Sequence, residues 1–403
     1  MKWETYKLKQ LCSEIVDCVN KTAPTSDVPT PYKMLRTSDI RDGKINLENL
    51  NCVTKEVYEK WTRRGKLQKG DVIFTREAPL GEVGLVREEK NYFLGQRLVL
   101  FRANNKMCDG RFLMYSLLWH DNKQAIISKG VGSTVAHLRV PECENIEIKV
   151  PDLDAQHRIA DILSAYDDLI ENNQKQIKLL EEAAKRLYKE WFVDLRFPGH
   201  ENTKIVDGVP EGWNWCKLED AIQLDPKVTL TKERMKQFIP MSALSTSSMV
   251  LDESQFTETT SNSGSKFQNG DTLLARITPC LENCKTAYVS GLKSDEGAVG
   301  STEYIVMRAK TINSYMVYLL ARTDDFRQSA INSMSGSDGR QRVKSDKLKM
   351  LDYLHPTSEL VEKFENVEKP IFEKIYRLSK QMQQAKQARD LLLPKLMSGE
   401  VEV

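Results

Sequence analysis

Several kinds of segment are missing from this 403-residue sequence, and each absence narrows the function. No apolar run approaches the roughly 18 residues that a membrane-spanning helix needs, so we expect no membrane insertion. The amino-terminal MKWETYKLKQ has no apolar core of the kind found in secretory signals, which favours a cytoplasmic protein. The eight cysteines include one close pair, Cys280 and Cys284, so we expect reduced structural thiols and no zinc site.

The motifs of common catalytic sites are missing too. The sequence has no G-x-x-x-x-G-K-[ST] phosphate loop. The glycines at 130–134 (GVGST) lack the third glycine and the acidic residue of a dinucleotide-binding turn. The five histidines are isolated, and the adjacent carboxylates Asp167-Asp168 and Asp324-Asp325 point to different sides of a helix. We therefore expect no catalytic residue, no metal and no cofactor, which indicates a binding protein.

The chain contains an internal repeat. Four phrases recur in the same order after 200 to 210 residues. The pairs are WETYKL (3–8) with WNWCKL (213–218), KGDVIFTREAPLGEVGLV (69–86) with NGDTLLARITPCLENCKTAYV (269–289), FLMYSLL (112–118) with YMVYLLA (315–321), and residues 132–151 with 336–356. Each copy has short apolar runs separated by Gly, Asn and Asp, which is typical of short strands. The repeat therefore predicts two mixed α/β globules related by a pseudo-twofold axis.

Each copy ends in a long amphipathic pattern with apolar residues at alternating spacings of three and four, a heptad seam that must be buried against another helix. The seams are Leu163, Tyr166, Ile170, Ile177, Leu180, Ala184, Leu187 and Trp191 in the first copy, and Phe364, Ile371, Ile375, Leu378, Met382, Ala385, Leu392 and Leu396 in the second. We predict that the two seams pack together as a long antiparallel coiled coil, about 57 Å in length. The alternative is that each helix docks on its own globule. Pro370 should kink the second helix or separate a short first piece from it.

Both helical patterns also carry apolar residues outside the seam, at Ile159, Leu169, Leu179, Leu391 and Leu393. Two helices cannot cover these side chains between them, and exposed apolar patches of this kind usually mark interfaces. We therefore predict that Leu179 and Leu393 bind a protein partner.

Several loops combine Arg or Lys with small hydroxyl residues, the mixture that contacts phosphates and base edges. The net charge is only +2, although residues 1–150 carry 25 Lys and Arg against 19 Asp and Glu. A mildly basic domain is compatible with DNA binding and also common without it. The candidate DNA-binding residues are Arg36, Thr37, Ser38, Arg63, Arg64, Arg76, Ser133, Thr134, Arg139, Arg276, Arg340, Arg342 and Lys344. For each of them, an ordinary solvated surface position is the alternative.

Taken together, these features resemble a known family. The duplicated order, the phrase VPEGWNWCKLED (209–220), the turn phrase KGDVIFTREAPLG, the helix beginning DAQHRIADILSAYDDLIENN and the ending LLLPKLMSGEV (391–401) resemble the specificity subunit of type I restriction-modification systems. The resemblance implies target recognition domains at 1–152 and 198–356, with conserved spacer helices at 153–197 and 357–403.

The resemblance further implies that each recognition domain binds half of a bipartite site in double-stranded DNA. The helices would bind two methyltransferase subunits, and catalysis would belong to these adenine methyltransferases and to a restriction translocase subunit. Two alternatives remain at this stage. One is a cytoplasmic coiled-coil scaffold without DNA specificity, and the other is an autonomous restriction or methylation enzyme, which the missing motifs disfavour.

Overall fold

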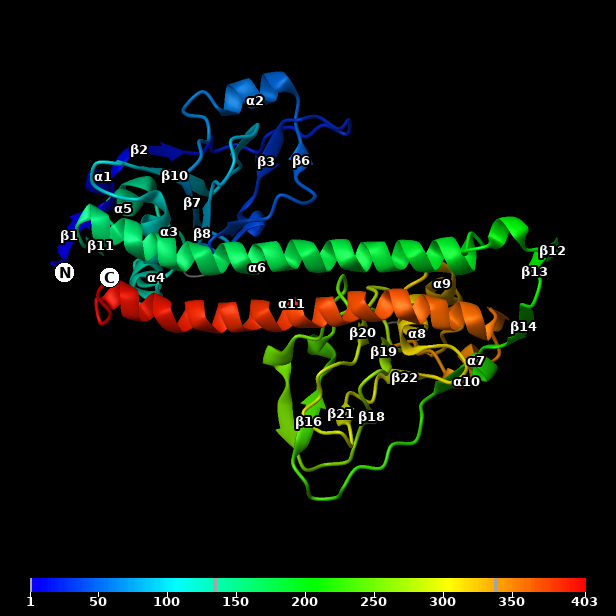
Figure 1. The fold of residues 1–403 in the computed structure, drawn as a ribbon. Helices are drawn as coiled ribbons and strands as arrows, with labels where there is room; N and C mark the ends of the chain where they lie inside the picture. Colours follow the sequence, from blue (N-terminus) through cyan, green and yellow to red (C-terminus); the bar gives the residue numbers. More distant parts are fainter. Residues whose placement is uncertain (1, 133–135, 337–339) are drawn as a thin grey trace. The chain divides into compact units, whose positions relative to one another are not determined.

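The computed structural model describes residues 2–132, 136–336 and 340–403, and its chain divides into two compact units (Figure 1). Unit 1 comprises Met1–Leu169 with Gln384–Val403, and unit 2 comprises Ile170–Gln383. Two long helices, α6 (Leu153–Tyr188) and α11 (Ser358–Ser398), each contribute one part to either unit. In the described ranges, no helix is long and apolar enough to cross a membrane.

Unit 1 is built on a four-stranded antiparallel sheet of order β2-β10-β7-β8. These strands are β2 (Cys12–Asp17), β10 (Leu98–Ala103), β7 (Val72–Arg76) and β8 (Leu80–Leu85). The apolar runs predicted as strands are buried, and Phe74, Phe101 and Phe112 are fully covered in the core. The remaining elements are β1 (Glu4–Lys7) paired with β11 (Glu147–Val150), the sheet of β3 (Lys33–Leu35), β6 (Asn51–Cys52) and β9 (Tyr92–Leu94), the pair β4 (Ile40–Arg41) and β5 (Lys44–Ile45), and the helices α1 (Leu8–Leu11), α2 (Lys55–Trp61), α3 (Gly110–Leu118), α4 (His120–Ser128) and α5 (Val140–Glu144).

Unit 2 contains a four-stranded sheet of order β15-β22-β19-β20, in which all neighbours are antiparallel. These strands are β15 (Ile222–Leu224), β22 (Tyr304–Ala309), β19 (Thr272–Ala275) and β20 (Thr286–Tyr288). The remaining elements are a second sheet of β17 (Thr257–Thr259), β16 (Lys236–Ile239), β21 (Ala298–Gly300) and β18 (Ser265–Phe267), the pairs β12 (Ile205–Val206) with β13 (Val209–Pro210) and β14 (Asn214–Lys217) with β23 (Asp352–His355), and the helices α7 (Leu218–Ala221), α8 (Ser314–Ala321), α9 (Asp324–Asn332) and α10 (Ser345–Lys349). The fold class is therefore mixed α/β, as predicted.

The two four-stranded sheets have the same strand order, and the matching sequence phrases occupy matching strands. The phrase KGDVIFT forms β7 and the phrase NGDTLLA forms β19. In each case the strand is paired on one side with its hairpin neighbour, β8 or β20, and on the other with the later strand β10 or β22.

The long helices bury most of the predicted seam. In unit 1, Leu163 shares a core with Leu392 and Leu396. In unit 2, the seam positions Ile170, Ile177, Ile375 and Leu378 are buried, and Leu180, Leu187 and Ile371 pack against the core. Tyr166 and Met382 are half-buried. Within unit 2, Asn173 contacts Gln381 while Tyr188 contacts Phe364, so the two helices run antiparallel there.

The structure bears on two expectations about these helices. Pro370 was expected either to kink the second helix or to separate a short first piece from it, and the separate piece does not occur, because α11 is one helix from Ser358 to Ser398. Phe364 and Phe372 on either side of Pro370 are both buried in the same core, so packing outweighs the backbone hydrogen bond that proline cannot donate. Ile159 was expected on an outer face, but it is fully buried in the core of unit 1, because the globular part of that unit covers α6.

Of the two predicted partner contacts, Leu179 is 64% exposed and remains available. Leu393 is only half-exposed, because it packs against the core of unit 1. Its neighbour Leu391 is 68% exposed and is the better placed apolar side chain.

Candidate nucleic-acid interface

In each unit, one loop is attached by backbone contacts to the end of a central strand of the four-stranded sheet. This strand is β7 in unit 1 and β19 in unit 2. We call the described residues 130–132 and 136–138 of unit 1, and 334–336 and 340–343 of unit 2, the tip loops. In unit 1, the amide of Leu138 donates to the carbonyl oxygen of Arg76 at 3.0 Å, and His137 forms bridges with Glu77 and Val131. The predicted residues Ser133 and Thr134 lie outside the described residues.

The tip loop of unit 2 has the same attachment. The amide of Val343 donates to the carbonyl oxygen of Arg276 at 2.9 Å, and Arg342 forms bridges with Ile277 and Ser335. Because the bridges and the hydrogen bond are made by the backbone, the side chains along each loop can vary without loss of this geometry. The loops are therefore suited to presenting different side chains on one frame.

The side chains of the predicted residues Arg76 and Arg276 donate hydrogen bonds to backbone carbonyl oxygens of the tip loops. Arg76 donates from Nη1 to the carbonyl oxygen of Leu138 at 3.2 Å, and its Nη2 lies 3.0 Å from a carboxylate oxygen of Asp17. Arg276 donates from Nε to the carbonyl oxygen of Val343 at 3.0 Å. Both side chains therefore position a loop.

Other predicted residues are also engaged within the fold. Arg36 binds the Asp39 carboxylate through Nε at 3.0 Å and Nη2 at 2.8 Å, and Arg64 donates to the carbonyl oxygen of Cys18 at 2.9 Å. Arg342 contacts both carboxylate oxygens of Glu303 at 2.7–3.0 Å, and this ion pair lowers the pKa of Glu303.

The candidates that stay exposed lie at the loops and turns. Thr37 is half-buried in a short turn, Thr37–Asp39. Arg64 and Arg342 are exposed as well as engaged, and the other exposed candidates are Ser38, Arg63, Arg139, Arg340 and Lys344. Arg340 and Lys344 flank the anchored part of the tip loop in unit 2, and Arg139 follows the tip loop in unit 1.

A polar pocket of about 260 Å³ opens beside the tip loop of unit 1. Its lining residues are Asn20, Arg76, Glu77, Gln96, Arg97, His137 and Leu138. Arg97 is 52% exposed and its Nε lies 3.4 Å from a carboxylate oxygen of Glu77. Of these residues, only Arg76 was predicted from the sequence, because the pocket is formed by four separate segments of the chain. The one available signal was the position of Arg97 directly before the apolar run LVLF.

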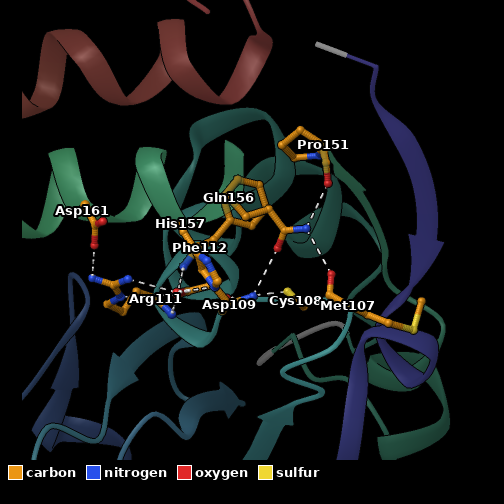
Figure 2. A network of polar contacts seen from close by, with 9 residues as sticks. All are labelled: Met107, Cys108, Asp109, Arg111, Phe112, Pro151, Gln156, His157 and Asp161. Carbon is orange, nitrogen blue, oxygen red and sulfur yellow. Dashed lines mark hydrogen bonds and ion pairs between the residues drawn. The ribbon is translucent and has the colours of Figure 1, made fainter. Parts of the chain in front are cut away.

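Figure 2 shows a network of polar contacts that joins residues 107–112 of unit 1 to the start of α6. The buried side chain of Gln156 donates to the carbonyl oxygens of Met107 and Pro151, both at 3.0 Å, and accepts from the amide of Asp109 at 3.2 Å. The Asp109 carboxylate in turn caps α3 by accepting from the amides of residues 111 and 112. Unit 2 has a comparable joint, where Asn313 caps α8 and donates to the carbonyl oxygen of Val361 in α11.

The described part of the chain holds no group of three or more His, Cys, Asp and Glu side chains arranged for a metal.

Comparison with known proteins connects this architecture to one family. Residues 1–182 match the family model described as the type I restriction modification DNA specificity domain. The chain is 26% identical to the type I restriction enzyme MjaIX specificity subunit of Methanocaldococcus jannaschii, over 83% of this chain and 78% of that protein. The chain is therefore similar to type I specificity subunits over most of its length. The HindI specificity subunit of Haemophilus influenzae is 20% identical over 91% of this chain and 94% of its own length.

One solved structure shares the fold of this chain. The type I restriction-modification S subunit of M. genitalium matches 98% of this chain and 96% of its own, with a TM-score of 0.62 and 15% sequence identity. This likeness supports the mixed α/β architecture with long helices.

Proposed function

We propose that this chain is the DNA-specificity subunit of a type I restriction-modification complex, in which each unit binds one half of a bipartite site in double-stranded DNA. The observation that carries the proposal is the tip loop, which is attached by equivalent backbone contacts to the same strand end in both units. Exposed basic side chains follow or flank each loop, as contacts to phosphates and base edges require. The shared strand order supports an internal duplication of the recognition unit.

The two half-sites should differ in sequence, because equivalent positions hold different side chains. The amide of Arg76 donates to the carbonyl oxygen of Arg97, and the amide of Arg276 donates to that of Glu303, so Arg97 and Glu303 are equivalent. By the same logic, His137 of unit 1 corresponds to Arg342 of unit 2. Two recognition sites with different donors and acceptors bind different bases.

We further propose that α6 and α11 form an antiparallel coiled coil that sets the spacer between the half-sites, as the predicted domain boundaries at 152/153, 197/198 and 356/357 imply. Two methyltransferase subunits would dock on exposed apolar positions of these helices, of which Leu179 and Leu391 are the clearest. Methyl transfer would belong to those partners, and translocation and cleavage to a restriction subunit. The scaffold alternative has no structural observation in its favour.

The test replaces Arg340, Arg342 and Lys344 of unit 2 together with alanine in the complex reconstituted with its methyltransferase. Binding is measured by competition with duplexes in which either half-site is scrambled. We expect discrimination to fall in one half-site only, with a loss of about 1–3 kcal/mol for each base-contacting residue. Equal loss in both half-sites, or unchanged affinity at every salt concentration, would contradict the proposal. Arg158→Ala, an exposed arginine on α6, is the matched control.

A further inference from the structure

The pocket beside the tip loop of unit 1 pairs one uncommitted donor group with one acceptor group. In the described part of the chain, the single ion pair of Arg97 is the 3.4 Å contact from Nε to Glu77. The Nη groups of its guanidinium therefore remain available to a ligand. Glu77 is 31% exposed, so its carboxylate is accessible from the same side.

The carboxylate beside Arg97 argues against a phosphate. The other arginine, Arg76, is committed to Asp17, which it shares with Arg64, and to the carbonyl oxygen of Leu138. Arg97 has its own carboxylate, because its Nε lies 3.4 Å from Glu77. A phosphate would meet the Glu77 carboxylate at close range, whereas a base edge is neutral and can use donor and acceptor together.

We infer that Arg97 and Glu77 form a subsite for one G·C base pair in the half-site bound by unit 1. In the major groove, guanine presents two acceptors, O6 and N7, and its cytosine presents the N4 amino donor beside them. A guanidinium next to a carboxylate complements this edge, because arginine donates to O6 and N7 and glutamate accepts from N4. This inference rests on the proposed function. It adds which residues of unit 1 bind a base pair and which base pair they bind.

Unit 2 cannot bind the same base pair in the same way. The position equivalent to Arg97 holds Glu303, which is bound on both oxygens by Arg342, and the position equivalent to Glu77 holds the apolar Ile277. The subsite is therefore specific to unit 1. Substitutions in it should reduce base discrimination in one half-site only.

The experiment selects binding sequences from a pool of random duplex DNA, with the chain assembled with its methyltransferase partner. The wild-type complex should select a bipartite site, and Arg97→Gln should change one base pair of it. Because glutamine donates to N7 of adenine and accepts from its N6 amino group, we expect the G·C preference to fall about ten- to hundred-fold and to shift toward A·T. Glu77→Ala should relax the same base pair, and Arg41→Gln, an exposed arginine outside the pocket, should leave the site unchanged.

Three results would overturn the inference: an unchanged selected sequence for Arg97→Gln, relaxation in both half-sites, or a uniform loss of affinity with a weaker salt dependence, which marks a phosphate contact. Thermal unfolding checks each variant. If Arg97→Gln does not fold, Arg97→Lys keeps the charge and should retain affinity while losing base discrimination. A wild-type complex that selects no sequence would contradict the proposed function itself.

Discussion

Asp71 and Asp271 close the same turn in the two units. The Asp71 carboxylate accepts from Arg102 at 2.9 and 2.8 Å and from the amide of Gln68 at 2.7 Å. Asp271 does the same with Arg308 at 2.6 Å for both bonds. Bidentate pairs of this kind fix strand positions strongly. In unit 1 the pair joins the turn before β7 to β10, and of the two pocket arginines Arg76 ends β7 and Arg97 directly precedes β10.

We expect Asp71→Ala to destabilise unit 1 by about 3 kcal/mol, because it leaves the guanidinium of Arg102 without its buried partner. This figure is at the low end for a broken buried pair, since Glu14 still contacts Arg102 at 2.5 Å. Urea unfolding measures the change. The control is Asp168→Ala, which removes an exposed partner of Arg87 and should cost less than about 1 kcal/mol. Equal effects of the two substitutions would contradict a structural role for the Asp71 turn.

At the scale of single elements, α11 carries a carboxylate side chain, Glu368, in a buried position. Glu368 is fully buried in unit 2, and neither of its carboxylate oxygens has a hydrogen-bond partner among the described residues. The matching position of α6, counted from Pro151 and Pro356, is the buried Leu163. Burial raises the pKa of Glu368 from its ordinary value of 4.5 to about 7.

This pKa shift makes the stability of unit 2 depend on pH. Between pH 4.5 and about 7 the folded state holds a proton that the unfolded chain releases, so the free energy of unfolding falls as the pH rises through this range. Glu368→Leu should abolish that fall and stabilise the chain above pH 7 by a few kcal/mol, with little effect at pH 4. Thermal unfolding between pH 4 and 8 tests this. The exposed Glu359→Leu on the same helix is the control, and a similar pH dependence in wild type and Glu368→Leu would rule the idea out.

The periodicity of the sequence predicted the seam faces of the long helices well. It predicted less well which other helix faces pack against the globular part of each unit. Leu163, Ile177 and Ile375 lie in the seam as expected, because a 3.6-residue repeat identifies the buried face of a helix directly. Ile159 was misplaced because a second buried face arises only when the globular part packs on α6.

The candidate DNA interface was predictable only in part. Loop composition identified Arg340 and Lys344, which are exposed. It did not identify Arg97 or Glu77, because tertiary folding alone brings them beside His137. Composition also cannot show that Arg76 and Arg276 bind loop carbonyl oxygens within the fold.

At the scale of the whole molecule, each unit has its own core and its own joint to the long helices. In unit 1 the joint is Gln156 with Asp109, and in unit 2 it is Asn313 with the start of α11. In unit 1 the joint connects α3 to α6, and in unit 2 it connects α8 to α11. Residues of both α6 and α11 also belong to the other unit. Under the proposed function, a recognition surface joined to a helix in this way would move with that helix, as a spacer between half-sites requires.

The point where both helices pass from one unit to the other is the place to test the spacer. Insertion of four residues after Leu169 and four after Gln383 keeps the contacts within each unit, including that of Asn173 with Gln381. Four helical residues add about 6 Å, which corresponds to one or two base pairs at about 3.4 Å each. We expect methylation mapping to show both half-sites unchanged and the spacer lengthened by that amount. A four-residue insertion between Asp207 and Gly208, in the turn of the β12–β13 hairpin, is the control and should leave the spacer as it was. If the doubly extended chain remained active on the original spacer, the helices would not set the distance.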